Sequence, residues 1–374
     1  MLMRNTAGRV LSRIVMTVSM VGVSLCAGSS CQAAPQEFLY PVPVKGKYGF
    51  MDRSGQIVIQ PRFDHVRLFS EGLAVVEIGD KQEYIDTNGN LMIPPTYEGA
   101  HSFSEGLAAF KVGQKWGYID KAGRVAIEPR FGNQFGGAGP FSEGLAAVLF
   151  DGKMGYIDHS GRFTIEPQFG FAEEFSEGLA VVGMVVGENT AKDDFFGYVD
   201  KAGKVVVALH YAHAQPFHEG LAVVNVHRRG VKFYPELVID RSGGQVVGAM
   251  DASIGDFHEG LAAIYLRESG DAGFIDKDGK QIILPKLRNM NDAQPSGFHE
   301  GLAAVSLPNG RIGYVNHKGD MVIGARFDIA CPFMGARALV FEHNQVGYIN
   351  EAGQYIWSTA TKELPDNDEP GCFW

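Results

Sequence analysis

The 374-residue chain lacks most of the features that mark an enzyme or a nucleic-acid-binding protein. It contains only four Cys and three Trp, and past the first 34 positions it has no basic cluster. It has no Gly-x-Ser-x-Gly elbow, no phosphate-binding Gly-Lys-Ser/Thr loop and no dinucleotide fingerprint. No segment of useful length shows a helical period. We therefore expect no catalytic activity, no cofactor and no metal ion.

The longest apolar run lies near the start of the chain. Three Arg within the first 13 residues precede an apolar stretch from Ile14 to Ala27, and small residues follow up to Ala34. This order is typical of a secretory signal peptide, and the stretch is short for a membrane span. We predict a signal peptide over residues 1–34 and a periplasmic or extracellular location. A transmembrane anchor, or a lipid anchor at Cys26 or Cys31, is the less favoured alternative.

Removal of this segment would leave 30 Lys and Arg against 43 Asp and Glu, a formal charge of −13. A chain with this charge repels nucleic acid and anionic lipid, so neither is an expected partner. Two Cys would remain, Cys331 and Cys372. Disulfides persist in exported proteins, so these two are a candidate pair, with two free thiols as the alternative.

A six-residue motif recurs through the rest of the chain. Phe-Ser-Glu-Gly-Leu-Ala or Phe-His-Glu-Gly-Leu-Ala occurs seven times, and a degenerate copy, Phe-Met-Gly-Ala-Arg-Ala, begins at Phe333. The copies lie 34 to 42 residues apart. A period in this range indicates a repeat array whose units share their apolar surfaces. The copies begin at Phe69, Phe103, Phe141, Phe175, Phe217, Phe257, Phe298 and Phe333.

A second motif of the type Gly-Tyr-Ile-Asp-x-x-Gly recurs nine times, from Gly49 to Gly353. Asp or Asn opening a turn and Gly closing it, with apolar β-formers on both sides, predicts a β-hairpin. A third strand, such as Leu73 to Val76, follows each Phe-x-Glu-Gly turn. We predict an all-β array of eight to nine three-stranded antiparallel meanders over residues 35–358, followed by a C-terminal tail at 359–374.

One segment resembles the bacterial WG-repeat family. The segment from Lys115 to Gly123, Lys-Trp-Gly-Tyr-Ile-Asp-Lys-Ala-Gly, is followed by Ile-Glu-Pro-Arg-Phe and Phe-Ser-Glu-Gly-Leu-Ala. Only Trp116 keeps the Trp of that pattern. The resemblance implies a non-catalytic, all-β repeat protein, often associated with the cell envelope, and it defines no ligand.

The sequence favours an open, curved, solenoid-like array. Uneven unit lengths and the degenerate last copy suit capped open ends. A closed β-propeller is the alternative, because the period overlaps that of propeller blades, although those usually contain four strands.

Two recurring polar side chains invite a functional interpretation. The Glu of each turn either forms an acidic stripe or accepts hydrogen bonds from the backbone of the next turn, and its recurrence favours the structural role. His218, His258 and His299 replace Ser in three turns and lack the second His of a zinc helix motif. A histidine ladder across the units is the alternative to three local turn residues.

We predict a binding scaffold that engages a protein or glycan at the cell envelope. Long stretches between strands interrupt the repeat, and such loops commonly carry binding residues. A carbohydrate-active enzyme with paired carboxylates, or a purely structural or adhesion component, is the alternative. The predicted contact residues are Asn189, Lys192, Asp193, Asp194, Arg228, Arg229 and Tyr234.

Overall fold

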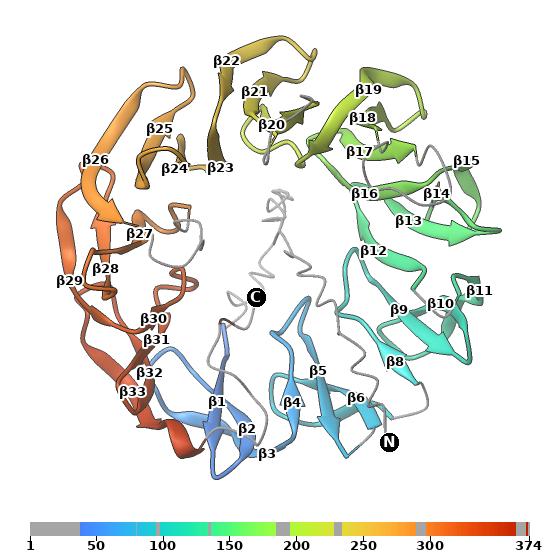
Figure 1. Cartoon of the computed structure of the whole chain (residues 1–374). Helices are drawn as coiled ribbons and strands as arrows, with labels where there is room; N and C mark the ends of the chain where they lie inside the picture. The colour runs from blue at the N-terminus through green and yellow to red at the C-terminus, as the bar shows by residue number, and fades with distance from the viewer. Residues whose placement is uncertain are drawn as a thin grey trace, which may run out of the picture.

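The computed structural model describes residues 38–79, 81–94, 98–133, 136–184, 195–227, 234–288, 297–363 and 372. Its strands form eight antiparallel sheets, and one of them has seven strands and spans two repeats. The described residues therefore form nine units, which stand side by side around a central axis (Figure 1). One 3-10 turn, Thr361–Glu363, follows the last strand.

The units follow one another in chain order. Units 1 to 3 contain β1 (Tyr40–Val44), β2 (Lys47–Met51), β3 (Ile57–Phe63); β4 (His65–Val66), β5 (Leu73–Ile78), β6 (Lys81–Asp86), β7 (Leu91–Ile93); and β8 (Gly99–Ala100), β9 (Leu107–Val112), β10 (Lys115–Asp120), β11 (Val125–Phe131). Units 4 to 6 contain β12 (Ala138–Ser142), β13 (Leu145–Phe150), β14 (Lys153–Ile157), β15 (Phe163–Phe169); β16 (Phe171–Ser176), β17 (Leu179–Met184), β18 (Phe195–Asp200), β19 (Val205–Ala214); and β20 (Leu221–Val226), β21 (Glu236–Asp240), β22 (Gln245–Met250). Units 7 to 9 contain β23 (Ala252–His258), β24 (Leu261–Leu266), β25 (Asp271–Asp276), β26 (Gln281–Arg288); β27 (Leu302–Ser306), β28 (Ile312–Asn316), β29 (Met321–Phe327); and β30 (Ile329–Ala330), β31 (Ala338–Glu342), β32 (Gln345–Ile349), β33 (Tyr355–Ala360).

The all-β repeat array is as predicted, but most units have four strands instead of three. The additional strand is the innermost one, and in units 2, 3 and 9 it has only two residues. In unit 6 the end of β19 takes this place and pairs with β20. The prediction missed this strand in units 2, 3 and 9 because a two-residue strand leaves no alternating pattern to detect; in units 4, 5 and 7 the strand has five to seven residues and was predicted as part of the loop before the Phe-x-Glu-Gly turn.

Successive antiparallel strands place the turns on two opposite faces of the ring. The Phe-x-Glu-Gly turns and the Asx-x-x-Gly turns lie on one face, which we call the glutamate face. An ion pair of 3.0 Å between Glu71 and Lys121, one from each kind of turn, joins them. The turns between second and third strands lie on the other face. The described strand ends that flank the long interruptions, such as Met184 of β17 and Phe195 of β18, lie there, so we call it the insertion face.

The hydrophobic core lies between neighbouring sheets. The start of the second strand is buried on both sides, as in Leu73 to Val76 of β5. One cluster combines Val75 and Tyr84 of unit 2 with Phe103 and Phe110 of unit 3. Each unit therefore completes its core with the apolar face of the next, as the repeat pattern predicts.

The Gly of the Gly-Tyr-Ile-Asp motif is required by a close backbone approach. A Cβ on Gly117 would lie 2.4 Å from the carbonyl oxygen of Ile127 in the outer strand. The pairing of β10 with β11 shifts register at this point. Such a bulge brings the two strands too close for any side chain.

The Tyr of the same motif links each unit to the next. The hydroxyl of Tyr118 donates to the backbone carbonyl of Gly139 at 2.7 Å, and the hydroxyl of Tyr156 donates to the backbone carbonyl of Glu173 at 2.7 Å. Both rings are fully buried, so the bond satisfies a polar group that would otherwise be costly to bury. Tyr84, Tyr198 and Tyr314 make the same bond to the inner strands of their neighbours.

The same bond closes the ring. The hydroxyl of Tyr348 in unit 9 donates to the carbonyl of Pro41 in unit 1 at 2.9 Å. Tyr40 and Met51 of unit 1 share one core cluster with Leu339 and Tyr348 of unit 9. The predicted open array is therefore wrong in this respect, and the alternative, a closed propeller-like ring, describes the structure (Figure 1).

The degenerate copy at Phe333 lies at this seam and is not a cap on a free end. No Phe-x-Glu-Gly copy precedes unit 1, so no turn of that kind meets unit 9. Gly335 replaces the Glu, and its carbonyl accepts a bond from the Tyr40 hydroxyl. Arg337 replaces the Leu and donates to the carbonyl of Arg53 in unit 1 at 2.6 Å. The copy that departs from the motif is therefore the one whose neighbour is unit 1.

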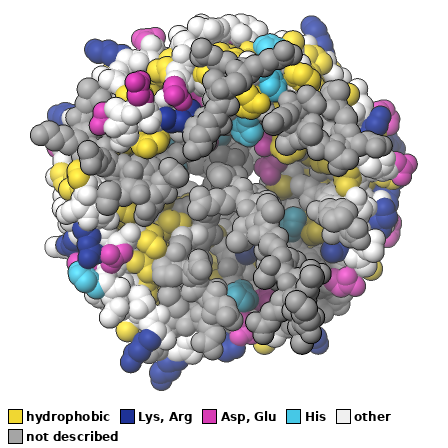
Figure 2. All heavy atoms as spheres, viewed as in Figure 1, with side chains coloured by type: hydrophobic (Ala, Val, Ile, Leu, Met, Phe, Trp, Pro, Cys, Tyr) yellow, Lys and Arg dark blue, Asp and Glu magenta, His cyan; other side chains and the backbone are white. Residues whose placement is uncertain are grey.

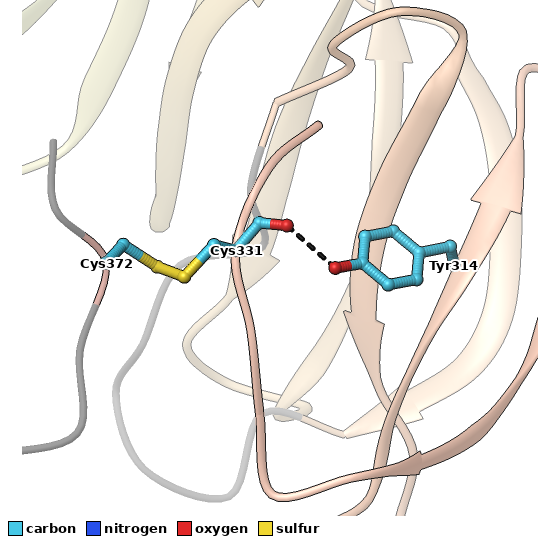
Figure 3. The surroundings of a disulfide bond; sticks show 3 residues. All are labelled: Tyr314, Cys331 and Cys372. Atoms are coloured by element: carbon cyan, nitrogen blue, oxygen red, sulfur yellow. Dashed lines mark hydrogen bonds between the residues drawn. A yellow bond between two sulfur atoms is a disulfide. The ribbon is translucent and has the colours of Figure 1, made fainter. Parts of the chain in front are cut away.

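A disulfide joins Cys331 and Cys372, whose Cα atoms are 5.7 Å apart (Figure 3). Cys331 is fully buried next to β30, and its carbonyl accepts the hydroxyl of Tyr314 at 2.7 Å (Figure 3). The bond ties residue 372 to the inner edge of unit 9.

Candidate functional site

The recurring Glu is a structural residue that joins consecutive turns. Glu105 adopts a left-handed φ of 52°, and its carboxylate accepts the N–H of Gly144 in the next turn at 2.9 Å. Glu143 does the same with Gly178 at 2.9 Å. The same contact recurs from Glu71, Glu177, Glu219, Glu259 and Glu300 to the next turn. The predicted structural role is confirmed.

Five of these carboxylates also meet a basic or imidazole side chain from the Asx turn of the next unit. Glu143 pairs with Lys201 at 3.0 Å, and Glu219 pairs with Lys277 at 3.1 Å. His159 and His317 take the place of Lys opposite Glu105 and Glu259. These acids are therefore engaged within the ring and do not form an acidic stripe that awaits a ligand.

The three histidines, for which a ladder was the alternative to the predicted local turn role, lie side by side. The ring centroids of His218 and His258 are 5.4 Å apart, and those of His258 and His299 are 4.9 Å apart. Nε2 of His218 lies 3.8 Å from a carboxylate oxygen of Asp256. Within the described ranges, no three His, Cys, Asp or Glu side chains are arranged to hold a metal ion.

Two carboxylates on the inner strand of unit 5 were not singled out by the sequence. Burial raises the pKa of Glu173 to about 7, and nearby Glu174 and Asp256 add to the shift. Burial raises the pKa of Glu174 to about 7 as well. Perturbed carboxylates of this kind occur both at functional sites and in structural networks. Their only sequence signal is a pair of acids directly before the motif Phe, where no other copy of the motif carries two acids.

Six of the seven predicted contact residues lie outside the described residues. They are Asn189, Lys192, Asp193, Asp194, Arg228 and Arg229. The seventh, Tyr234, is half-buried just before β21, and its carbonyl accepts the side-chain amide of Asn225 at 3.2 Å. Its ring meets that of His227 edge to face at 5.4 Å.

Tyr234 belongs to a larger group of rings on the insertion face of units 5 and 6. His227 lies 5.1 Å from Phe195, measured between ring centroids. Phe196 occupies the Trp position of its unit and contacts Phe171 at 5.4 Å and His213 at 5.9 Å. The contacts form two groups of three rings, because Phe195 and Phe196 are consecutive on β18 and their side chains point to opposite faces of the sheet. We call the two groups together the aromatic patch: Phe171, Phe195, Phe196, His213, His227 and Tyr234.

The aromatic patch is only partly covered. Phe171 is 39 % exposed, and Met184, which ends the neighbouring strand β17, is 43 % exposed. Partly exposed aromatic rings bury much apolar area on binding and lose little side-chain entropy. The patch lies where two of the long interrupting stretches leave and rejoin the sheets, at Met184 to Phe195 and at His227 to Tyr234. Sequence reasoning missed it because its rings come from five separate strand ends.

Lys and Arg side chains are scattered around the rim of the ring and mixed with Asp and Glu (Figure 2). No helix among the described residues is long and apolar enough to cross a membrane.

The fold and its inter-unit contacts define an all-β tandem-repeat protein whose units are joined in a ring. The family model for the WG containing repeat matches residues 48–81, 84–116, 116–153, 154–184, 196–227 and 273–310. These matches cover more than half of the chain, which belongs to the WG-repeat family. Their boundaries fall within strands of consecutive units, so one match does not coincide with one sheet.

Other comparisons add little. No curated protein matches the chain. Among solved structures, the computationally designed Ika8 protein is 12 % identical with a TM-score of 0.46, covering 76 % of this chain and 92 % of its own. BamB from Moraxella catarrhalis is 11 % identical with a TM-score of 0.38, covering 84 % and 94 %. Hsv2p from Kluyveromyces lactis is 12 % identical with a TM-score of 0.39, covering 66 % and 89 %. These similarities are too weak to support a functional argument.

Proposed function

We propose that this protein is an exported, non-catalytic scaffold that binds a protein or glycan at the cell envelope through the insertion face of units 5 and 6. The observation that carries the proposal is the aromatic patch, which gathers six rings from two units at the base of two long interruptions. Aromatic faces suit both classes of partner, because protein hot spots are rich in Tyr and Trp and ring faces offer flat apolar contact to a sugar.

The ring supports this role by holding the patch rigidly. Phe195 and His227 come from units 5 and 6, and the interface between these units is fixed by the bond from the Tyr198 hydroxyl to the Gln215 carbonyl and by the contact of Glu177 with Gly220. A rigid patch loses little conformational entropy when it binds. Export rests on the predicted signal peptide at residues 1–34.

The test compares the mature wild-type protein with a Phe171→Ser/Tyr234→Ala variant in capture from envelope extracts and on a glycan array. The control is Met321→Ser, which changes a side chain of similar exposure, 40 %, on the outer strand of unit 8. We expect the patch variant to lose at least about tenfold in affinity, since each removed aromatic contact is worth roughly 1–2 kcal/mol. Equal binding by the patch variant and the wild type would place the site elsewhere.

The enzyme alternative has its own readout. Glu173 and Glu174 are the described carboxylates to substitute first, because their pKa values are the most perturbed. Hydrolysis of an envelope glycan by the wild type that is lost in Glu174→Gln would favour a carbohydrate-active enzyme over a scaffold.

A further inference from the structure

The Phe-x-Glu-Gly turns, which we call the inner turns, are linked through different side chains in two parts of the ring. In units 2 to 5 a Ser hydroxyl follows the motif Phe and donates to the Phe carbonyl of the next turn. Ser104 donates to Phe141 at 2.6 Å, and Ser142 donates to Phe175 at 2.7 Å. Ser70 and Ser176 make the same bond at 2.6 Å. These hydroxyls are uncharged at every pH of interest.

In units 6 to 8, His218, His258 and His299 take the place of those Ser residues. Among the described residues, none of the three donates to the next Phe carbonyl. Instead the imidazoles form a row of rings tilted by 34° and 36° to one another, with centroid separations of 5.4 Å and 4.9 Å, which we call the histidine stack. Gly297 leaves room for it, because a Cβ there would lie 2.9 Å from Cδ2 of His258. Three imidazoles, the side chains whose ordinary pKa lies nearest to neutral pH, therefore stand where units 2 to 5 have uncharged Ser hydroxyls.

The acids around the stack can balance only part of that charge. Asp256 of β23 faces His218 at 3.8 Å. Glu219 already accepts from Gly260 and pairs with Lys277, while Glu259 accepts from Gly301 and lies 3.1 Å from His317. Of these three acids, Asp256 is the one that is not paired with a Lys or His from an Asx turn, and it faces three imidazoles.

We propose that the histidine stack makes units 6 to 8 an acid-sensitive sector of the ring, whose inner turns separate when the imidazoles become charged, while the Ser-linked units 2 to 5 stay joined. Two charges about 5 Å apart in a partly desolvated site repel strongly. The repulsion acts between adjacent turns, so it loosens the interfaces between units rather than the sheets themselves.

The direction of the effect follows from the environment of the rings. Burial lowers the pKa of His258, and the neighbouring His218 lowers it further. Burial and His258 lower the pKa of His299 in the same way. Their folded pKa values thus lie below the unfolded value of about 6.5. The stability that the neutral stack provides is complete above that value and is lost as the pH falls through it toward the folded pKa.

Glu173 and Glu174 of β16 respond in the opposite direction. Their pKa values of about 7 are raised by burial, so the fold gains stability from their protonation as the pH falls. Burial also raises the pKa of Asp256, against the lowering effect of His218 and His258. A Glu173→Gln/Glu174→Gln background removes two of these three opposing groups and leaves Asp256 in place in every variant that is compared.

The experiment uses the full mature chain in that background. The melting temperature is measured at about pH 7.5 and about pH 5.5 with and without His218→Ser/His258→Ser/His299→Ser. We expect the parent to lose at least about 3 °C more on acidification than the triple variant. Hydrogen exchange should show faster opening at residues 217–222, 257–262 and 298–303 at the lower pH, but unchanged protection at 103–108 and 141–146.

Two further measurements keep the outcome decisive if the triple variant folds poorly. The reciprocal variant Ser104→His/Ser142→His/Ser176→His should transfer acid sensitivity to units 3 to 5. NMR titration of the imidazoles in the wild-type protein should give a pKa below the ordinary imidazole value for at least one group, with non-ideal, coupled curves. Equal acid response of parent and triple variant, or three independent imidazole titrations near 6.5, would overturn the proposal.

Discussion

Removing the Tyr348 hydroxyl tests whether the ring is closed in solution. In Tyr348→Phe the carbonyl of Pro41 loses its partner while the ring of Tyr348 still fills its fully buried site. A buried acceptor left without a partner costs about 1–3 kcal/mol. We expect a loss of about 1–2 kcal/mol in the free energy of unfolding, because the bond of 2.9 Å is ordinary in length.

Tyr118→Phe is the matched control. It removes the same kind of bond, 2.7 Å to Gly139, at an interface whose existence does not depend on closure. Both variants are compared with the wild type by urea unfolding followed by far-UV circular dichroism and tyrosine fluorescence. Similar shifts of both midpoints support a closed ring. A midpoint for Tyr348→Phe equal to the wild type, beside a clear loss in Tyr118→Phe, would refute closure.

Three further predictions follow from the inter-strand geometry, the turns and the disulfide. Gly117→Ala should cost at least about 2 kcal/mol, because the new Cβ meets a backbone oxygen at 2.4 Å, whereas Gly324→Ala, which meets nothing within 4 Å, should change little in the same urea unfolding assay. Hydrogen bonds in its turn lower the pKa of Asp120, with the Arg124 side chain the largest cause. The stability that ionised Asp120 adds is therefore present above the unfolded pKa near 4 and is lost as the pH falls through the folded pKa. The free energy of unfolding should therefore decrease less on acidification in Asp120→Asn than in the wild type. Cys372→Ser should lower the free energy of unfolding by up to about 4 kcal/mol, because the disulfide closes a loop with a sequence separation of 41 residues. A reductant should cause the same loss in the wild type and no further loss in the variant.

The local structure of each unit could be predicted from the sequence because its signals are local. The Asx-x-x-Gly hairpins and the buried strand after each Phe-x-Glu-Gly turn are set by residues within about ten positions of one another. The role of Glu105 could be inferred from recurrence alone, since a contact that every interface needs must recur in every unit.

Ring closure could not be predicted, because it depends on the angle between neighbouring sheets, and the spacing of the motifs in the sequence does not determine that angle. The degenerate copy misled the interpretation for the same reason. Gly335 and Arg337 look like decay of the motif until Tyr40 and Arg53 are placed beside them. The aromatic patch could not be predicted either, since its two groups of rings come from strand ends up to 63 positions apart in the sequence, from Phe171 to Tyr234.

The seam has a consequence for how this protein can change over evolution. A linear stack of repeats can lengthen or shorten by one module without disturbing the rest. Here each junction contributes about one ninth of a full rotation, so gaining or losing a module would require every other junction to adopt a new angle. The specialised residues at the meeting of the two ends therefore fix the number of modules, and sequence drift is directed into the connecting segments, where length can vary without altering the circle.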